Sequence, residues 1–343
     1  MMRKVMPAMY KDVVNDMPNY GEQFDERSMW LAKQETKTPK SSVIVYLHGG
    51  GYFLQTQPMQ LAMICTLYKL VNKATRSNLN ILFLDYKLVS EGEYPLPYQV
   101  VELYKTYVNL VNAGYEDIQL LGDSAGGNIA ICFTQYLYML YNKLPDSNIN
   151  TTLEISKQIY PSELILVSPW VKLLPEIADI YTPGKSWHDN EKYDIITHNL
   201  GESIKHIVKT AKLDHLLVSP GNAKAEVEDW LRIPLFSDPK LRLFVLFGED
   251  ESFRDDIIDW CENALGVPSE TFAAKNRQYS YTKFDKSKSK CQVEIHMEPY
   301  GIHDSLFFFE DDAAIALRQK KPLDINKYYG LTRVVDFVNR HFE

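Results

Sequence analysis

Ser124 stands in a Gly-Asp-Ser-Ala-Gly pentapeptide that directly follows the aliphatic run of residues 118–121. The glycines two residues before and after the serine remove side chains that would clash in a sharp turn between a strand and a helix, so the hydroxyl is expected to stand out at the edge of a sheet. The N-terminus of the following helix favours developing negative charge. This setting is typical of a nucleophile in acyl transfer, and we predict that role for Ser124.

A second glycine-rich motif, His-Gly-Gly-Gly at residues 48–51, follows another apolar run. Acyl transfer through a tetrahedral intermediate needs backbone N–H donors aimed at the oxyanion, and consecutive glycines let the backbone approach a substrate closely. We predict that the N–H groups of Gly50, Gly51 and Ala125 form this oxyanion hole. His48 precedes the glycines and is predicted to be structural.

A base must take the proton of Ser124, because a serine hydroxyl is a poor nucleophile near neutral pH. His303 lies in a loop after the last predicted strand, where the third member of a triad belongs if the order is serine, acid, histidine. The acid should follow the strand of residues 241–247, and the segment after that strand offers several carboxylates. Asp250 and Glu251 are among them, and the residues alone leave the choice open.

Short aliphatic runs alternate along the chain with helical patterns, which is typical of an α/β fold with a mostly parallel central sheet and helices on both faces. The predicted strands are residues 43–47, 81–85, 118–121, 164–167, 241–247 and 292–296. The predicted helices are residues 61–74, 98–112, 128–142, 257–265 and 332–342.

Three segments interrupt this alternation. Residues 1–40 are polar and helix-like, and we predict them to be an N-terminal cap segment preceding a catalytic domain of residues 41–343. Residues 175–235 are rich in apolar residues without a strand pattern, so they are predicted to be a helical cap insertion. The basic and polar stretch 275–290 is predicted to be a solvated loop.

Together these motifs resemble the hormone-sensitive lipase family of α/β-hydrolases, over residues 40–310. Two further stretches agree with the family: residues 85–95, which begin Asp-Tyr-Lys-Leu, and residues 186–194, where the cap of the family begins. The family's acid stands three residues before an arginine, which places Glu251 at that position ahead of Arg254. The resemblance therefore implies an α/β-hydrolase fold with a helical cap over the substrate, with Glu251 as the acid and Asp250 as the alternate.

The predicted function is hydrolysis of a small-molecule carboxylic ester through an acyl-enzyme, on a hydrophobic or lipid ester, with neither metal nor organic cofactor. A weaker resemblance to fungal steryl acetyl hydrolases implies a sterol acetate as substrate. The alternatives are an amidase or peptidase with the same triad, and a noncatalytic ligand-binding protein on the same fold, because plant gibberellin receptors resemble this family but have lost the histidine. Retention of Ser124 and His303 argues against the last alternative.

The composition of the chain limits the binding partners and the cellular location that we predict. With 343 residues, a net charge of −8 and a pI near 5.6, the chain has no general attraction for nucleic acid. Its four cysteines lie far apart without a metal-binding spacing. No run is long and apolar enough to cross a bilayer. The chain as written is predicted to be cytoplasmic, and a location at the endoplasmic reticulum membrane is the alternative if an N-terminal anchor precedes it. The oligomeric state is not predicted.

Overall fold

The computed structural model describes residues 3–144, 153, 155–197, 201–223, 225–272, 280–283, 291–319, 321, 324 and 327–342. Its centre is an eight-stranded sheet in the order β1-β3-β2-β4-β5-β6-β8-β7. Six central strands run parallel, and the edge strands β1 and β7 are antiparallel to their neighbours. The strands are β1 Ser28–Ala32, β2 Ser42–Leu47, β3 Leu79–Leu84, β4 Asp117–Asp123, β5 Glu163–Val167, β6 Arg242–Gly248, β7 Ser280–Lys283 and β8 Gln292–Glu298.

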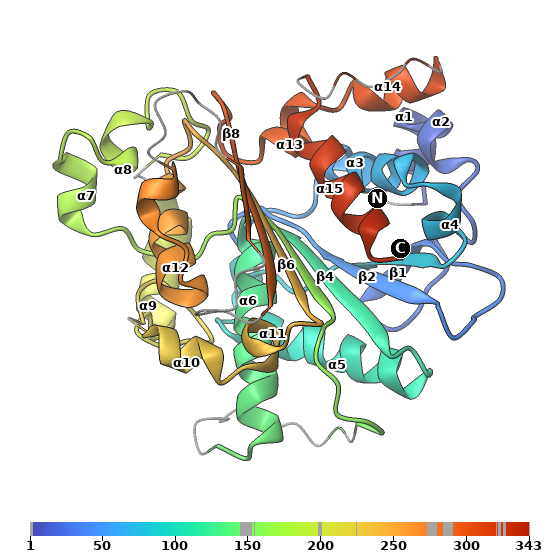
Figure 1. Ribbon diagram of the computed structural model, residues 1–343, viewed down its shortest axis with the longest axis horizontal. Helices are drawn as coiled ribbons and strands as arrows, with labels where there is room; N and C mark the ends of the chain where they lie inside the picture. The colour runs from blue at the N-terminus through green and yellow to red at the C-terminus, as the bar shows by residue number, and fades with distance from the viewer. Residues whose placement is uncertain are drawn as a thin grey trace.

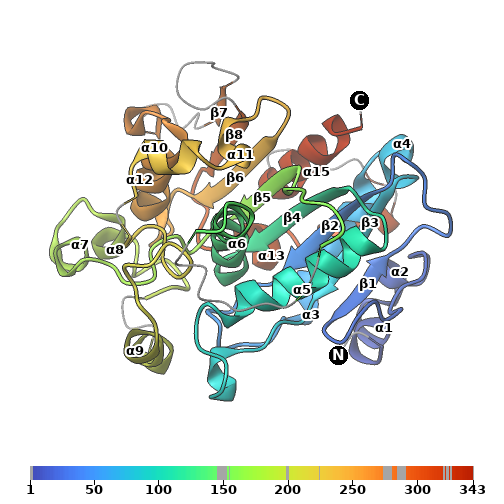
Figure 2. The ribbon, with the colours of Figure 1, turned by 90° about the horizontal axis from the view of Figure 1, so that it is seen from below.

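Helices cover both faces of the sheet, as Figures 1 and 2 show. One face packs mainly against α5, α6 and α12, and the other against α3, α13 and α15, together with α1 and α2. The helices of these layers are α1 Val5–Met9, α2 Lys11–Val14, α3 Pro58–Leu70, α4 Lys73–Arg76, α5 Tyr98–Asn112, α6 Ala125–Tyr141, α12 Arg254–Leu265, α13 Ser305–Phe309, α14 Ala313–Arg318 and α15 Tyr329–Arg340. Short 3-10 turns occur at Val89–Glu91 and Ser269–Phe272. The central strands are buried on both faces, which explains their almost uninterrupted apolar sequences.

The α/β fold and its parallel core are confirmed, and every predicted strand and helix of that core lies within a few residues of an observed one. Two expectations are wrong. The segment 1–40 contains the edge strand β1, which pairs with β3, so it is not helical throughout. The predicted solvated loop at 275–290 contains β7, which pairs with β8, and the rest of that loop lies outside the described residues. β1 is itself apolar and largely buried, but it is only five residues long and stands within an otherwise polar segment. β7 is four residues long.

Where the structure describes them, residues 175–235 contain a series of helices. They are α7 Ile177–Tyr181, α8 Ser186–Asp189, α9 Gly201–Thr210 and α10 Val227–Leu231, with α11 Pro234–Ser237 leading back to β6. The helices α7, α8 and α9 lie at the left of Figure 2, whereas α10 and α11 lie beside α12. The described part of this stretch contains no strand. The division of the chain into cap segments and a catalytic domain stays a prediction. Among the described residues, no helix is both long and apolar enough to cross a membrane.

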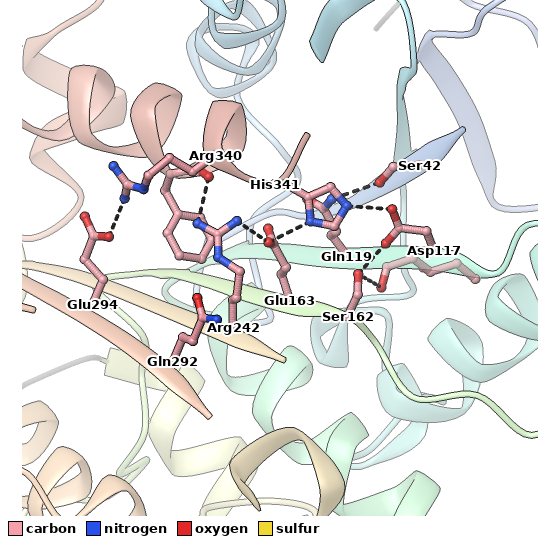
Figure 3. A network of polar contacts seen from close by, with 12 residues as sticks. Ser42, Asp117, Gln119, Ser162, Glu163, Arg242, Gln292, Glu294, Arg340 and His341 are labelled. Atoms are coloured by element: carbon pink, nitrogen blue, oxygen red, sulfur yellow. Dashed lines mark hydrogen bonds and ion pairs between the residues drawn. The ribbon is translucent and has the colours of Figure 1, made fainter. Parts of the chain in front are cut away.

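A polar network ties the last residues of the chain to the amino ends of the strands (Figure 3). The imidazole of His341, which follows α15, lies 2.8 Å from Glu163 through Nδ1 and 2.6 Å from Asp117 through Nε2. The Arg242 guanidinium donates to Glu163 at 2.7 Å and lies over the ring of Phe337. Burial opposes the charge of His341, but its hydrogen bonds with the two carboxylates outweigh burial and raise its pKa to about 10. The network therefore holds α15 against the sheet through a charged histidine.

Candidate active site

Ser124 lies in the turn between β4 and α6 with a backbone φ of +48°. This conformation is uncommon for a residue with a side chain, and it persists because both flanking elements fix it. The turn also brings α6 very close to β2: a Cβ added to Gly126 would lie 2.0 Å from the carbonyl oxygen of Leu47. Glycine is thus required two residues after the serine, at position 126, as the sequence pattern predicts.

The glycine loop after β2 lies next to Ser124. Gly50 has a φ of +117° and Gly51 one of +61°, which few other residues adopt at low cost. The carbonyl of Gly50 accepts hydrogen bonds from the N–H groups of Phe53 and Leu54, at 3.0 and 2.9 Å. The loop is therefore a fixed turn, and both glycines line the same cavity as Ser124.

His48 packs beside this loop, away from the cavity. It is fully buried, stacks on Tyr86 with ring centroids 4.3 Å apart, and does not line the cavity. The Tyr86 hydroxyl donates to the His48 carbonyl at 2.6 Å. Burial lowers the pKa of His48 to about 4, so it is neutral near pH 7. Tyr86 belongs to the Asp-Tyr-Lys-Leu stretch of the sequence, which thus contributes to the shape of the glycine loop.

The two candidate acids differ in their surroundings. Glu251 is fully buried beyond the end of β6, and its Oε2 accepts hydrogen bonds from the Ser168 hydroxyl at 2.6 Å and from the Gly248 N–H at 2.8 Å. Asp250 is half-buried and donates its backbone N–H to the Gly301 carbonyl at 2.8 Å. The other oxygen of Glu251, Oε1, is buried and has no hydrogen bond.

His303 is buried in the loop between β8 and α13. Its Nε2 lies 3.3 Å from Oδ2 of Asp304, and its buried Nδ1 has no hydrogen-bond partner. Burial lowers its pKa to about 4, with Asp194 acting in the opposite direction. The neutral ring near pH 7 suits a base. No hydrogen bond joins the described side chains of Ser124, His303 and Glu251 to one another.

Carboxyl groups gather around this histidine. Burial raises the pKa of Glu251 to about 8, and Asp194 and Glu298 add to the shift. Burial also raises the pKa of Asp304 well above its ordinary value, with further contributions from Asp123, Glu251 and Asp194. Such shifts in neighbouring buried acids are typical of functional sites.

The segment after α8 fixes the loops that carry the acid and the histidine. Asp194 accepts hydrogen bonds from the backbone N–H groups of Ser252 at 2.6 Å and His303 at 3.0 Å. Asn190 donates its side-chain amide to the Glu251 carbonyl at 3.0 Å. Residues 186–194, which resemble the start of the family's cap, therefore hold both loops of the site.

Ser124 and His303 face one cavity of about 360 Å³. Its wall is formed by the glycine loop, Asp304, glutamines and a majority of large apolar side chains: Phe53, Leu54, Trp170, Ile195, Ile196, Phe253 and Phe308. No lysine or arginine of the described residues lines it. A neighbouring hollow of about 500 Å³ is lined largely by polar and charged residues and contains none of the predicted site residues.

Sequence reasoning missed Ser168, Asp194 and Asp304. Ser168 carries no local motif, and only the fold brings it to the site. Asp194 ends the stretch 186–194 that resembles the start of the family's cap, but its hydrogen bonds to the loops of Ser252 and His303 appear only in the structure. Asp304 directly follows His303, so its position was visible, but its contact with Nε2 depends on a left-handed backbone with φ +55°. Among the described residues, no cluster of three or more histidine, cysteine or acidic groups could hold a metal ion.

The fold and this arrangement define the class of protein. A crystallised esterase of the bacterial hormone-sensitive lipase family aligns with a TM-score of 0.58 at 19% identity, covering 100% of this chain and 94% of that one. Crystallised EstE5 aligns with a TM-score of 0.56 at 19% identity, covering 98% and 91%. This likeness shows the fold alone, which is that of α/β-hydrolases.

Sequence comparison gives the particular family. Residues 8–297 match the steryl acetyl hydrolase family. The mug81 protein of Schizosaccharomyces pombe, to which a steryl acetyl hydrolase activity is provisionally ascribed, is 33% identical over 340 residues, covering 96% of this chain and 78% of that protein. Steryl acetyl hydrolase 1 of Saccharomyces cerevisiae is 28% identical over 37% of this chain and 26% of its own length. The chain belongs to the steryl acetyl hydrolase family and is a carboxylic-ester hydrolase related to hormone-sensitive lipase.

Proposed function

We propose that the protein hydrolyses acetyl esters of hydrophobic alcohols, sterol acetates among them, with Ser124 as the nucleophile and His303 as the base. The observation that carries the proposal is the strained turn at Ser124, which opens with His303 and the glycine loop onto one mainly apolar cavity. The names of the relatives in Saccharomyces cerevisiae and Schizosaccharomyces pombe support a sterol acetate as the substrate.

In the first step the Ser124 oxygen attacks the ester carbonyl carbon while His303 takes the hydroxyl proton. The N–H groups of Gly50, Gly51 and Ala125 stabilise the oxyanion. His303 then gives its proton to the leaving alcohol, and the acetyl group stays on Ser124. In the second step His303 takes a proton from water, the resulting hydroxide attacks the acyl carbon, and acetate leaves as Ser124 regains its proton.

Glu251 orients His303 and stabilises the imidazolium in this scheme. Oε1 of Glu251 and Nδ1 of His303 are both buried and both lack a partner, so a hydrogen bond between them would satisfy two costly groups at once. Hydrogen bonds of this kind are often long or unformed before substrate binds. We therefore expect this contact to form when the cavity fills.

The test is release of alcohol from a sterol acetate and of p-nitrophenol from p-nitrophenyl acetate and butyrate, by the wild type and by Ser124→Ala. We expect hydrolysis of all three by the wild type only. Equal rates for the two proteins would overturn the proposal, and activity on the soluble esters alone would overturn the sterol part of it. Cleavage of the matching p-nitroanilides at comparable rates would favour an amidase.

We also propose that the enzyme meets its substrate at a lipid surface. Leu54 and Ile195 line the cavity and yet are 62% and 50% exposed, and Phe309, next to the cavity residue Phe308, is 59% exposed. Exposed apolar groups at the mouth of a pocket favour contact with lipid. A Phe309→Ser variant should weaken binding to phosphatidylcholine vesicles while keeping its rate on p-nitrophenyl acetate, because Phe309 does not line the cavity. Unchanged vesicle binding by this variant, or none by the wild type, would contradict the proposal.

A further inference from the structure

The end of β5 touches every loop of the proposed site. The Ser124 N–H donates to the carbonyl of Val167, the last residue of β5, at 3.0 Å. Three residues further on, the Trp170 N–H donates back to the Ser124 carbonyl, also at 3.0 Å. The turn at Ser124 is thus held on both sides by the segment 167–170, whose Trp170 also lines the cavity.

Ser168 lies inside this segment and links the other two loops. Its hydroxyl donates to Oε2 of Glu251 at 2.6 Å and accepts from the Asp304 N–H at 3.1 Å. Its own N–H donates to the carbonyl of Leu246 in β6 at 2.7 Å. Ser168 is 2% exposed, so all these contacts are shielded from water.

The backbone of Ser168 shows that its position is constrained. Its φ of +42° is uncommon for a residue with a side chain, and it is held by the strand on one side and Pro169 on the other. A hydroxyl has one proton to donate, and Ser168 gives it to the carboxylate of Glu251. With the Gly248 N–H, it occupies Oε2 fully and leaves Oε1 as the open acceptor.

We propose that Ser168 is a positioning residue for ester hydrolysis, which fixes the Glu251 carboxylate so that Oε1 is presented to His303, and which joins the acid loop to the histidine loop. The inference rests on the roles proposed above for Ser124, His303 and Glu251. Ser168 touches neither substrate nor the reacting atoms in this scheme, and it does not line the cavity. Its loss should therefore lower kcat much more than it changes KM.

The same hydrogen bond has an electrostatic effect. A donor to a carboxylate favours its ionised form, and Ser168 lowers the pKa of Glu251 against the opposing effect of burial. The other titratable groups facing Glu251 are Asp194 after α8, Glu298 at the end of β8 and Asp304 before α13. All three are carboxyls, so none brings a positive charge that could take over the stabilisation of ionised Glu251. The reaction needs ionised Glu251, so removing the hydroxyl should move the acidic limb of the kcat/KM profile to higher pH.

Ser219 offers a matched control in the cap. It is fully buried, its hydroxyl donates to the side-chain oxygen of Asn222 at 2.6 Å, and it accepts from the Leu173 N–H at 2.9 Å. It therefore makes the same two kinds of hydrogen bond as Ser168, without contact to the proposed site residues. Ser219→Ala should reproduce the loss of stability that follows removal of a buried hydroxyl, and nothing more.

The experiment compares the wild type, Ser168→Ala, Ser168→Gly, Ser168→Cys and Ser219→Ala. Glycine adopts the left-handed backbone without strain, and cysteine keeps the volume with a weaker donor, so the set keeps the test available if alanine disturbs folding. We measure kcat and KM for p-nitrophenyl butyrate from pH 5 to 10, together with the thermal unfolding midpoint.

For Ser168→Ala and Ser168→Gly we expect a fall in kcat of about 10- to 100-fold, KM within about twofold, and an acidic limb displaced to higher pH, with Ser168→Cys in between. Ser219→Ala should keep the wild-type kcat and the wild-type position of the acidic limb in the pH profile. A wild-type kcat and limb in all the folded Ser168 variants, an equal loss in Ser219→Ala, or failure of all three to fold would overturn the inference. If Ser124→Ala retains activity the proposed function fails; if it is inactive while the Ser168 variants match the wild type, only this inference fails.

Discussion

His341 and His303 stand at opposite ends of the parallel sheet, and carboxyl groups surround both. At the amino ends of the strands, both ring nitrogens of His341 are within hydrogen-bond distance of a carboxylate, and its pKa is raised to about 10 (Figure 3). At the carboxyl ends, Nδ1 of His303 has no partner, and burial lowers its pKa to about 4. Near pH 7 the histidine at the amino ends of the strands is therefore charged, and the histidine at the carboxyl ends is neutral.

The two ends differ in the partners of their carboxylates. In the amino-end network the cations His341 and Arg242 hydrogen-bond Asp117 and Glu163, although Oε2 of Glu163 has no partner. Removing one member of such a network leaves an uncompensated buried charge. In the carboxyl-end cluster the acids face one another without a nearby lysine or arginine in the cavity wall, and polar atoms are left unpaired. A site that must bind and transform a substrate keeps such groups open at the expense of stability. Substitutions at the two ends should accordingly have opposite effects on stability and activity.

The largest effect is expected for Ser124→Gly. Turnover should fall by about 10⁴-fold or more, because the nucleophile is lost. Stability should rise by about 1 kcal/mol, because glycine relieves the left-handed backbone at this residue. Kinetics with p-nitrophenyl butyrate and urea unfolding measure the two quantities. A variant that is destabilised, or that keeps a tenth of the activity, would break the contrast between the two ends of the sheet.

Glu251→Gln should lower kcat by about 10³- to 10⁴-fold, whereas Asp250→Asn should stay within a few-fold of the wild type. The folded-state pKa of Glu251 is raised from 4.5 to about 8, so its contribution to stability is present below pH 4.5 and is lost as pH rises through 8. Glu251→Gln should therefore be more stable than the wild type at pH 9, and this advantage should shrink at pH 5. Wild-type turnover in Glu251→Gln with none in Asp250→Asn would make Asp250 the acid.

His341→Gln tests the amino end. Losing one partner of a buried charged network should cost about 3 kcal/mol of stability at pH 6. The folded-state pKa is raised from 6.5 to about 10, so the stabilisation is complete below pH 6.5 and disappears as pH rises through 10. Unfolding in urea at pH 6, 8 and 10.5 should show the gap between variant and wild type closing. The rate on p-nitrophenyl butyrate at pH 7 should stay within twofold, and a larger loss would mean that the two ends are coupled.

Tyr86→Phe should give the smallest effect. It removes the hydroxyl that donates to the His48 carbonyl and leaves that buried acceptor without this donor, at a cost of about 1 to 2 kcal/mol. Because this contact supports the glycine loop, we expect kcat to fall about threefold to tenfold with little change in KM. Thermal unfolding and steady-state kinetics measure both. An unchanged kcat would show that the loop keeps its shape without the hydroxyl, and would place Tyr86 with the stability-determining residues.

Much of the fold could be predicted because the central strands are buried on both faces and must be almost wholly apolar. The edge strands β1 and β7 were not predicted, because β1 is a buried apolar run of only five residues within a polar segment and β7 has only four residues. At the site, Ser124 and the glycines were predictable because their backbone geometry tolerates few residues. The residues alone left Asp250 and Glu251 as alternatives, because neighbouring carboxylates look alike in sequence. The structure buries Glu251 and gives its carboxylate two hydrogen-bond donors, whereas Asp250 is half-buried.

The sequence by itself determined the residues that a local backbone demands: the glycines around Ser124, the glycine loop, and the alternation that makes an α/β sheet. Only the tertiary structure decided how distant groups meet, as when Ser168 joins Glu251 to the loop of His303 or when His341 reaches the starts of β4 and β5. The physical reason is that a hydrogen bond or an ion pair depends on position in space. The position of a single hydroxyl or imidazole has no sequence pattern, whereas a strained turn requires glycines at fixed positions.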